Sequence, residues 1–246
     1  MRLNLILEKE LINQDKQVFI ENLKLFNNFL KENYKQKLII LHPQPKDLVG
    51  QNIIILLHAN LYRTKKLAEG FIDSINKQNP VTSVVLLRSL FESAGVISLI
   101  HKKYNFYKNK KVTYKELQEL LSRLYLGSKD KETVPESPDP INVMTLIDSL
   151  DYYLKNQYQK HDNRFRKVYD ILSELAHPNS FSNFIGNKIS RDFQSIDIAK
   201  DGSPFPLKTY KLEFFELIIY IYEEIYTRLE QDVLEKETIP FKKYKK

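Results

Sequence analysis

The residues best suited to chemistry lie where a predicted helix ends, in the segment Tyr169–Asn179. Ser173 and His177 are four positions apart, so a helix places both side chains on one face, one turn from each other. Pro178 disfavours the α conformation at His177, which predicts that the helix stops there. The imidazole would then lie at a helix C-terminus, where the macrodipole favours its protonated form. Asn179 follows and adds a further polar side chain.

A second polar pair, Arg88 and Glu92, is also spaced four apart and lies within an otherwise apolar segment. Leaving either charge unpaired among apolar neighbours would cost several kcal/mol, so each needs a partner. Arginine placed before glutamate is the weaker orientation of such a pair within one helix. We therefore predict that Arg88 and Glu92 meet Ser173 and His177 across two packed helices.

Other kinds of chemistry fit the sequence less well. Ser173 with His177 has the residue types of an acyl-transfer site, but no Gly-x-Ser-x-Gly turn is present. The chain has no cysteine, its five histidines are scattered, and it lacks a glycine-rich phosphate loop. We expect no metal and no cofactor. A solvated polar helix face remains an alternative for the stripe Arg166, Asp170, Ser173 and His177.

The positive charge of the chain is concentrated in two short runs. The net charge is +7, and the C-terminal run 239–246 contributes four lysines without an acid. The segment 101–111 contributes five more, together with Tyr104, Phe106 and Tyr107. Aromatic rings between lysines are typical of nucleic-acid binding, although solvated lysines are the plainer interpretation. The predicted nucleic-acid-binding residues are Lys102, Lys103, Lys108, Lys110 and Lys111.

The elements that must position these residues are helices. Apolar residues recur with helical period, which predicts an all-α fold: one helical bundle of six or seven helices with an irregular insertion near 178–208. We expect one domain, 1–246, comprising an N-terminal helix and linker (1–47), a bundle (48–236) and a basic tail (237–246). The expected helices span about 3–34, 48–77, 81–104, 113–127, 142–158, 163–177 and 209–236, and residues 128–140 form an exposed loop prone to local disorder. A small hairpin or an ordered loop is expected within the insertion.

Two motifs give a resemblance that covers residues 50 to 235. Leu87–Glu92 and Leu172–Asn179 resemble an all-helical bacterial family with an Arg-x-x-x-Glu helix and a Ser-x-x-x-His-Pro helix end. That family is similar in turn to an outlying branch of the HEPN superfamily, whose helical bundles are often dimeric. Many HEPN proteins are metal-independent ribonucleases of toxin–antitoxin and antiviral defence systems; others bind nucleotides or serve as scaffolds. The catalytic HEPN signature has an arginine five to seven positions before the histidine, where this chain has Asp170, Ile171 and Leu172.

The resemblance implies an effector that cleaves or binds RNA, with His177 as general acid and base and Arg88 stabilising the charge on phosphorus. Glu92 would orient Arg88, and Ser173 or Asn179 would position the phosphate. It also implies a homodimer and a protein partner such as an antitoxin or a defence component. The alternative is a non-catalytic scaffold in which these residues form a buried structural network. With no signal peptide or membrane-spanning segment expected, we predict a cytoplasmic protein.

Overall fold

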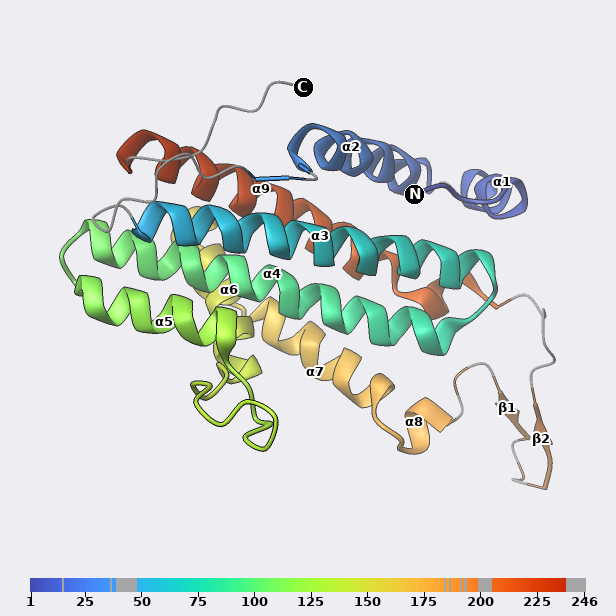
Figure 1. Ribbon diagram of the computed structural model, residues 1–246. Helices are drawn as coiled ribbons and strands as arrows, with labels where there is room; N and C mark the ends of the chain where they lie inside the picture. The colour runs from blue at the N-terminus through green and yellow to red at the C-terminus, as the bar shows by residue number, and fades with distance from the viewer. Residues whose placement is uncertain are drawn as a thin grey trace.

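The computed structural model describes residues 1–14, 16–35, 37–38, 48–183, 185, 187–190, 192, 194–198 and 205–237. Within these residues the fold is all-α, as predicted, with eight helices of nine or more residues (Figure 1). They are α1 (Leu5–Asn13), α2 (Gln17–Asn33), α3 (Leu48–Asn76), α4 (Pro80–Lys108), α5 (Tyr114–Leu126), α6 (Val143–Tyr158), α7 (Arg164–Ala176) and α9 (Leu212–Lys236). The remaining elements are α8 (Ser180–Asn183), η2 (Leu207–Tyr210), β1 (Lys188–Ile189) and β2 (Ile196–Asp197).

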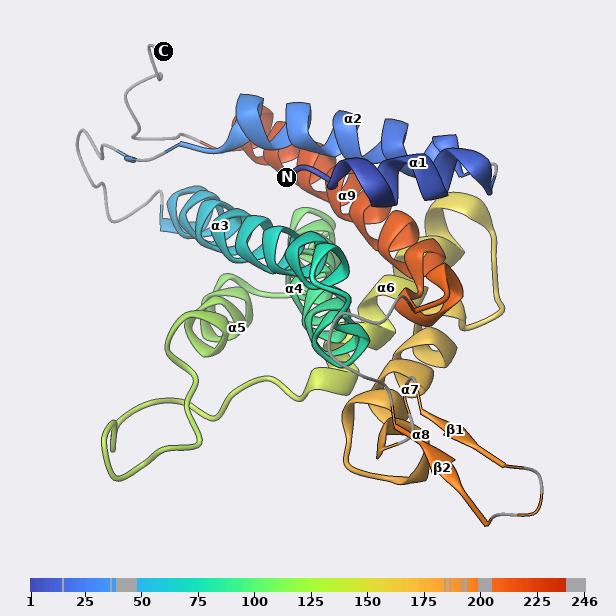
Figure 2. The ribbon, with the colours of Figure 1, turned by 90° about the vertical axis from the view of Figure 1, so that its right-hand side faces the viewer.

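Helix α4 is the central element of the bundle. It lies beside α3 along most of its length and also packs against α5, α6, α7 and α9 (Figures 1 and 2). Helix α2 covers α9 on the far side of the bundle from α5 (Figure 2). By length and composition α4 would be able to cross a membrane, but 67% of its most apolar window is buried inside the protein. Its apolar character is therefore that of a core helix.

Close packing holds α6 against the middle of α4. Gly95 lies so near Leu146 that a β-carbon at position 95 would stand 2.8 Å from the Leu146 Cβ. The hydroxyl of Ser149 donates to the Gly95 carbonyl at 3.1 Å, and the hydroxyl of Ser98 donates to the Ser149 carbonyl at 2.8 Å. These contacts fix α6 in position, and α6 in turn positions the start of α7.

Helix α7 begins on a carboxylate supplied by α6. Asp151 accepts hydrogen bonds from the backbone N–H groups of Phe165 and Arg166 at 2.9 and 3.0 Å. Both donors belong to the first turn of α7, where N–H groups have no partner within the helix. The ring of Phe165 then packs edge-on against Phe91 of α4, with centroids 5.9 Å apart. The direction of α7 along α4 follows from these contacts.

The structure corrects the prediction in the N-terminal region. The single helix expected over 3–34 is two helices, α1 and α2, because the chain turns back after Asn13. Asn and Asp are weak helix formers, and the turn allows Leu7 and Leu11 of α1 to be buried. Most of the linker predicted between the expected helix 3–34 and residue 47 lies outside the described residues, namely 36 and 39–47.

The irregular segments follow the predicted positions. The insertion contains α8, η2 and a short antiparallel hairpin that pairs Lys188 with Asp197. Residues 128–140 form a largely exposed loop, as predicted. The Ser128 N–H donates to the Pro138 carbonyl at 3.0 Å, and Arg123 donates to the Asp139 carbonyl at 2.9 Å. Residues 238–246, which include the lysine-rich tail, lie outside the described residues.

Candidate functional site

The predicted meeting of the two motifs is observed where α4 passes the end of α7. Nη1 of Arg88 lies 3.3 Å from Nε2 of His177. Nε of Arg88 donates to the hydroxyl of Tyr169 at 3.1 Å, and that hydroxyl donates to Oε1 of Glu92 at 2.8 Å. Arg88 and Glu92 also approach each other directly, with Nε and Oε1 3.6 Å apart. We call Arg88, Glu92, Tyr169 and His177 the Arg–His cluster.

The backbone at the end of α7 holds His177 in place. The helix ends at Ala176, and His177 has extended backbone angles, as Pro178 predicts. The N–H of His177 donates to the Ser173 carbonyl at 3.0 Å. Because a guanidinium carries only donors, Nε2 must provide a lone pair in the contact with Arg88.

Exposure differs across the Arg–His cluster. Tyr169 is buried, with 2% of its surface accessible, and burial raises the pKa of its hydroxyl, so that it remains a donor to Glu92. The side chains of Arg88 and Glu92 are 24% and 28% exposed, and His177 is exposed. The cluster thus has a buried anchor, two partly exposed charges and an accessible imidazole. Such an arrangement can bring a solute into contact with His177 and Arg88 together.

Tyr169 was not predicted as a site residue: the sequence analysis named it only as the first residue of the segment Tyr169–Asn179. It occurs eight positions before His177, so a helix places it on the same side two turns away. A tyrosine on a buried face needs a partner for its hydroxyl, and Arg88 and Glu92, which lie in an otherwise apolar segment, needed partners as well. That shared requirement is the signal that could have identified it.

Two of the predicted site residues lie apart from this network. Ser173 is partly buried between Tyr169 and His177, and its hydroxyl makes no hydrogen bond with the Arg–His cluster. Asn179 instead joins α7 to α8: its Nδ2 donates to the Glu174 carbonyl at 2.6 Å, and its Oδ1 accepts from the Ser182 N–H at 3.0 Å. The geometry therefore gives Asn179 a structural role at the end of α7, whereas Ser173 contributes there through its backbone carbonyl, which accepts from the His177 N–H.

The outer stripe of α7 is a surface ion-pair network. Arg166 pairs with Asp148 of α6 at 2.9 Å and with Asp170 at 3.8 Å. Neither of these ion pairs of Arg166 involves the Arg–His cluster. Arg166 consequently supplies no cation to His177, and Arg88 is the arginine that contacts it.

The lysine-rich segment lies toward the opposite end of α4, where Lys102 and Lys108 are roughly 20 to 30 Å along the helix axis from Arg88 at about 1.5 Å per residue. Lys108 pairs with Asp232 of α9 at 2.8 Å, and Lys102 lies 4.2 Å above the ring of Tyr152. Tyr104 is fully buried and donates to Glu237, so it offers no stacking surface, contrary to expectation. The other predicted lysines are partly or fully exposed: Lys103, Lys110 and Lys111.

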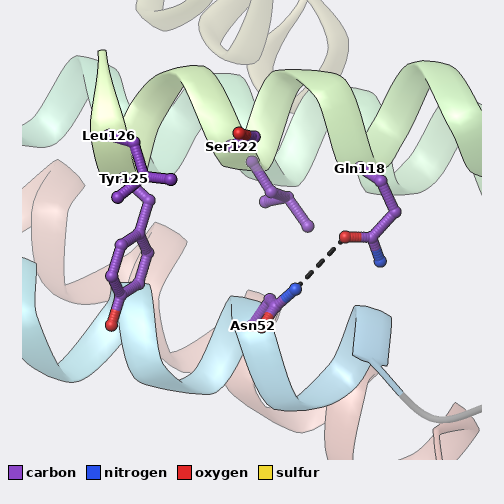
Figure 3. A pocket seen from close by; sticks show the side chains of 6 residues that line it. Asn52, Gln118, Ser122, Tyr125 and Leu126 are labelled. Atoms are coloured by element: carbon purple, nitrogen blue, oxygen red, sulfur yellow. Dashed lines mark hydrogen bonds between the residues drawn. The ribbon is translucent and has the colours of Figure 1, made fainter. Parts of the chain in front are cut away.

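Among the pockets formed by the described residues are two that border α3, the helix beside α4. One, of about 250 Å³, lies between α3 and α5 and is drawn in Figure 3; Nδ2 of Asn52 there donates to Oε1 of Gln118 at 3.1 Å. The other, of about 360 Å³, lies where α3, α4, α5 and α6 meet, and Glu92 is one of its lining residues. Only the second of these two pockets shares a residue with the Arg–His cluster.

In the described part of the chain, no three His, Asp or Glu side chains are grouped so as to hold a metal ion. No protein-family model, curated protein or solved structure matches this chain. The resemblance to HEPN proteins therefore rests on the two sequence motifs, and the function has to be argued from the geometry of the site.

Proposed function

We propose that this protein is a HEPN-like effector that cleaves RNA without a metal ion, with the Arg–His cluster as its active site. The observation that carries the proposal is the 3.3 Å contact between Arg88 Nη1 and the exposed His177 Nε2. It joins a permanent cation to a proton acceptor at a place that solvent reaches. A structural network that only fixed the helices would have no need of an exposed histidine.

The chemistry follows from the donor and acceptor roles. A bound phosphodiester would draw Arg88 from His177 to a non-bridging oxygen, which frees Nε2. His177 then takes the proton of the ribose 2′-OH, and the 2′-oxygen forms a bond to phosphorus. The bond from phosphorus to the 5′-oxygen breaks, and His177 returns its proton to that leaving oxygen. Arg88 stabilises the charge on the pentavalent phosphorus.

The remaining residues of the cluster hold Arg88 ready for this step. Tyr169 and Glu92 bind Nε, and Nη2 makes no hydrogen bond to any described residue. An arginine anchored at one edge presents its other edge to a phosphate with little loss of conformational freedom. The cation that catalytic HEPN proteins carry on the histidine helix would here come from the neighbouring helix α4.

The cellular context is proposed from the HEPN resemblance alone. It favours a cytoplasmic homodimer that acts in a toxin–antitoxin or phage-defence system together with a protein partner. The scaffold alternative, with a closed cluster and no substrate, agrees less well with the exposure of His177.

The test is cleavage of a mixed RNA pool by the full chain, with and without EDTA. We expect cleavage that EDTA leaves unchanged and that falls about 10²–10⁴-fold in His177→Ala, as for the loss of a general acid–base group. Arg88→Met should fall comparably. The matched control is Arg164→Met, because Arg164 lies at the far end of α7 and, among the described residues, forms its ion pair with Asp162. No cleavage by the wild type, or equal cleavage by His177→Ala, would refute the proposal.

A further inference from the structure

Glu92 belongs to a pocket as well as to the Arg–His cluster. The pocket of about 360 Å³ at the junction of α3, α4, α5 and α6 is small for a ligand site, near the lower end of the roughly 300–1,000 Å³ range. Its walls are mainly aliphatic, and Arg63, Glu92, Asn60 and Ser93 add polar groups; the aliphatic lining comprises Leu56, Ala59, Val96, Leu124 and Leu146. The size and lining suit one flat ring with polar edges.

The polar groups of the pocket divide into occupied and available ones. Both polar atoms of the Asn60 side chain already have partners, because Nδ2 donates to the Ser93 carbonyl and Oδ1 accepts from Tyr222. Arg63 is held by one bond, from Nε to the Ser93 hydroxyl at 3.1 Å, and no described carboxylate pairs with it. Glu92 uses Oε1 in the Arg–His cluster, and Oε2 bonds to no described residue.

In this pocket the exposed Arg63 has N–H groups available to acceptors, and Glu92 has a free carboxylate oxygen available to donors, so a ligand must offer both acceptors and donors to use them. Among the RNA bases, guanine meets this requirement best. Its O6 and N7 accept two hydrogen bonds from an arginine, and its N1–H and N2 amino group are adjacent donors that a carboxylate accepts. Adenine and cytosine offer one amino donor, and uracil offers one imide donor.

We infer that this pocket binds a guanine base and makes RNA cleavage selective for guanosine. The inference rests on the proposed function, since it places the scissile phosphate at Arg88 and the base beside it. Arg88 and Glu92 are one helical turn apart on α4, about 6 Å along the axis, which is within the reach of one nucleotide. Arg63 would bind O6 and N7, Glu92 would bind N1–H and the amino group, and the aliphatic walls would enclose the ring.

The test uses four DNA oligonucleotides that carry one ribonucleotide each, G, A, C or U, in the same sequence. Only the ribonucleotide has a 2′-OH, so cleavage reports the base at one position. We expect the wild type to prefer guanosine about 10- to 100-fold, as one well-made bidentate contact provides. Arg63→Met should lose this preference. Ala59→Trp should lose it too, because Ala59 is exposed and a larger side chain there fills the pocket without disturbing the core.

Binding of the four nucleoside 3′-monophosphates, measured by calorimetry, separates this inference from the proposed function. Melting curves confirm that each variant is folded, and Arg164→Met is again the control. Equal cleavage at all four ribonucleotides would overturn the guanine assignment and leave the proposed function standing. If no oligonucleotide is cleaved, the proposed function fails. The guanine pocket would still be supported if guanosine 3′-monophosphate binds more tightly than the other three nucleotides and Arg63→Met removes this preference. Equal binding of all four nucleotides, or no binding, would overturn the guanine assignment.

Discussion

Replacing Tyr169 by phenylalanine removes only the hydroxyl at the centre of the Arg–His cluster. The ring, 2% exposed beneath the Arg88 guanidinium, keeps its packing. Two hydrogen bonds to charged groups are lost, each worth roughly 1.5–3 kcal/mol when no other partner is available. Arg88 and Glu92 are about a quarter exposed and only 3.6 Å apart, so water and a closer direct pair recover much of this. We expect a net loss of about 1–2 kcal/mol in the free energy of unfolding.

Thermal unfolding measures this loss. For a chain of this length, 1 kcal/mol shifts Tm by roughly 2–4 °C, so Tyr169→Phe should melt about 2–8 °C below the wild type. The matched control is Tyr62→Phe. Tyr62 is 49% exposed, and its hydroxyl bonds to no described residue, so the control should stay within about 0.5 kcal/mol of the wild type.

The variant also tests how Arg88 is held against His177. Without the hydroxyl, Arg88 should turn toward Glu92 and withdraw from Nε2, which changes the ¹⁵N chemical shift of that nitrogen. A variant that melts with the wild type and keeps the His177 signal in place would show that Tyr169 does not organise the cluster. The reasoning that makes Tyr169 the buried anchor would then be wrong.

Two further predictions concern other parts of the molecule. Replacing the five lysines of segment 101–111 with glutamine should weaken RNA binding. The slope of the logarithm of the binding constant against the logarithm of the salt concentration should fall by about 0.7 for each phosphate that is no longer neutralised. Lys108→Gln alone should leave this slope unchanged, because Asp232 already neutralises Lys108. A separate prediction concerns the two buried histidines. Burial lowers the pKa of both His58 and His101 from 6.5 to about 4. Between pH 6.5 and pH 4 the unfolded chain therefore binds protons at these histidines that the native chain does not. The free energy of unfolding, measured with urea, should therefore fall as the pH is lowered from 6.5 to 4, by up to roughly 3 kcal/mol per histidine, and a pH-independent value would contradict the burial of these rings.

The helix boundaries that the sequence predicts well are those set by local chemistry. The helix predicted over 113–127 begins with a capping box formed by Thr113 and Glu116, and Asn142 caps α6. Pro178 ends α7 at the expected residue. The turn between α1 and α2 was missed because its cause is tertiary. Leu7 and Leu11 are buried only if the chain folds back, and a local apolar period cannot show this.

The site was predicted to the extent that a buried charge must have a partner. That requirement predicted the contact between Arg88 and His177, but it did not predict which of their atoms meet. The partners of the lysine segment were beyond prediction for a similar reason. Tyr152 and Asp232 come from α6 and α9, about 50 and 120 positions later, and no local spacing connects them to Lys102 or Lys108.

The geometry of Arg88 and Glu92 explains why the pair occurs in its unfavourable order. Within one helix, arginine before glutamate is the weaker arrangement, and the direct approach is indeed long, at 3.6 Å. The short contacts, 3.1 and 2.8 Å, run instead through the Tyr169 hydroxyl of another helix. The Tyr169 hydroxyl accepts from Arg88 and donates to Glu92, so α7 contacts both charged residues while they remain close to each other. The pair therefore links α4 to α7 at the point where His177 leaves the helix, and the same contacts that stabilise the packing set the position of the guanidinium against the imidazole.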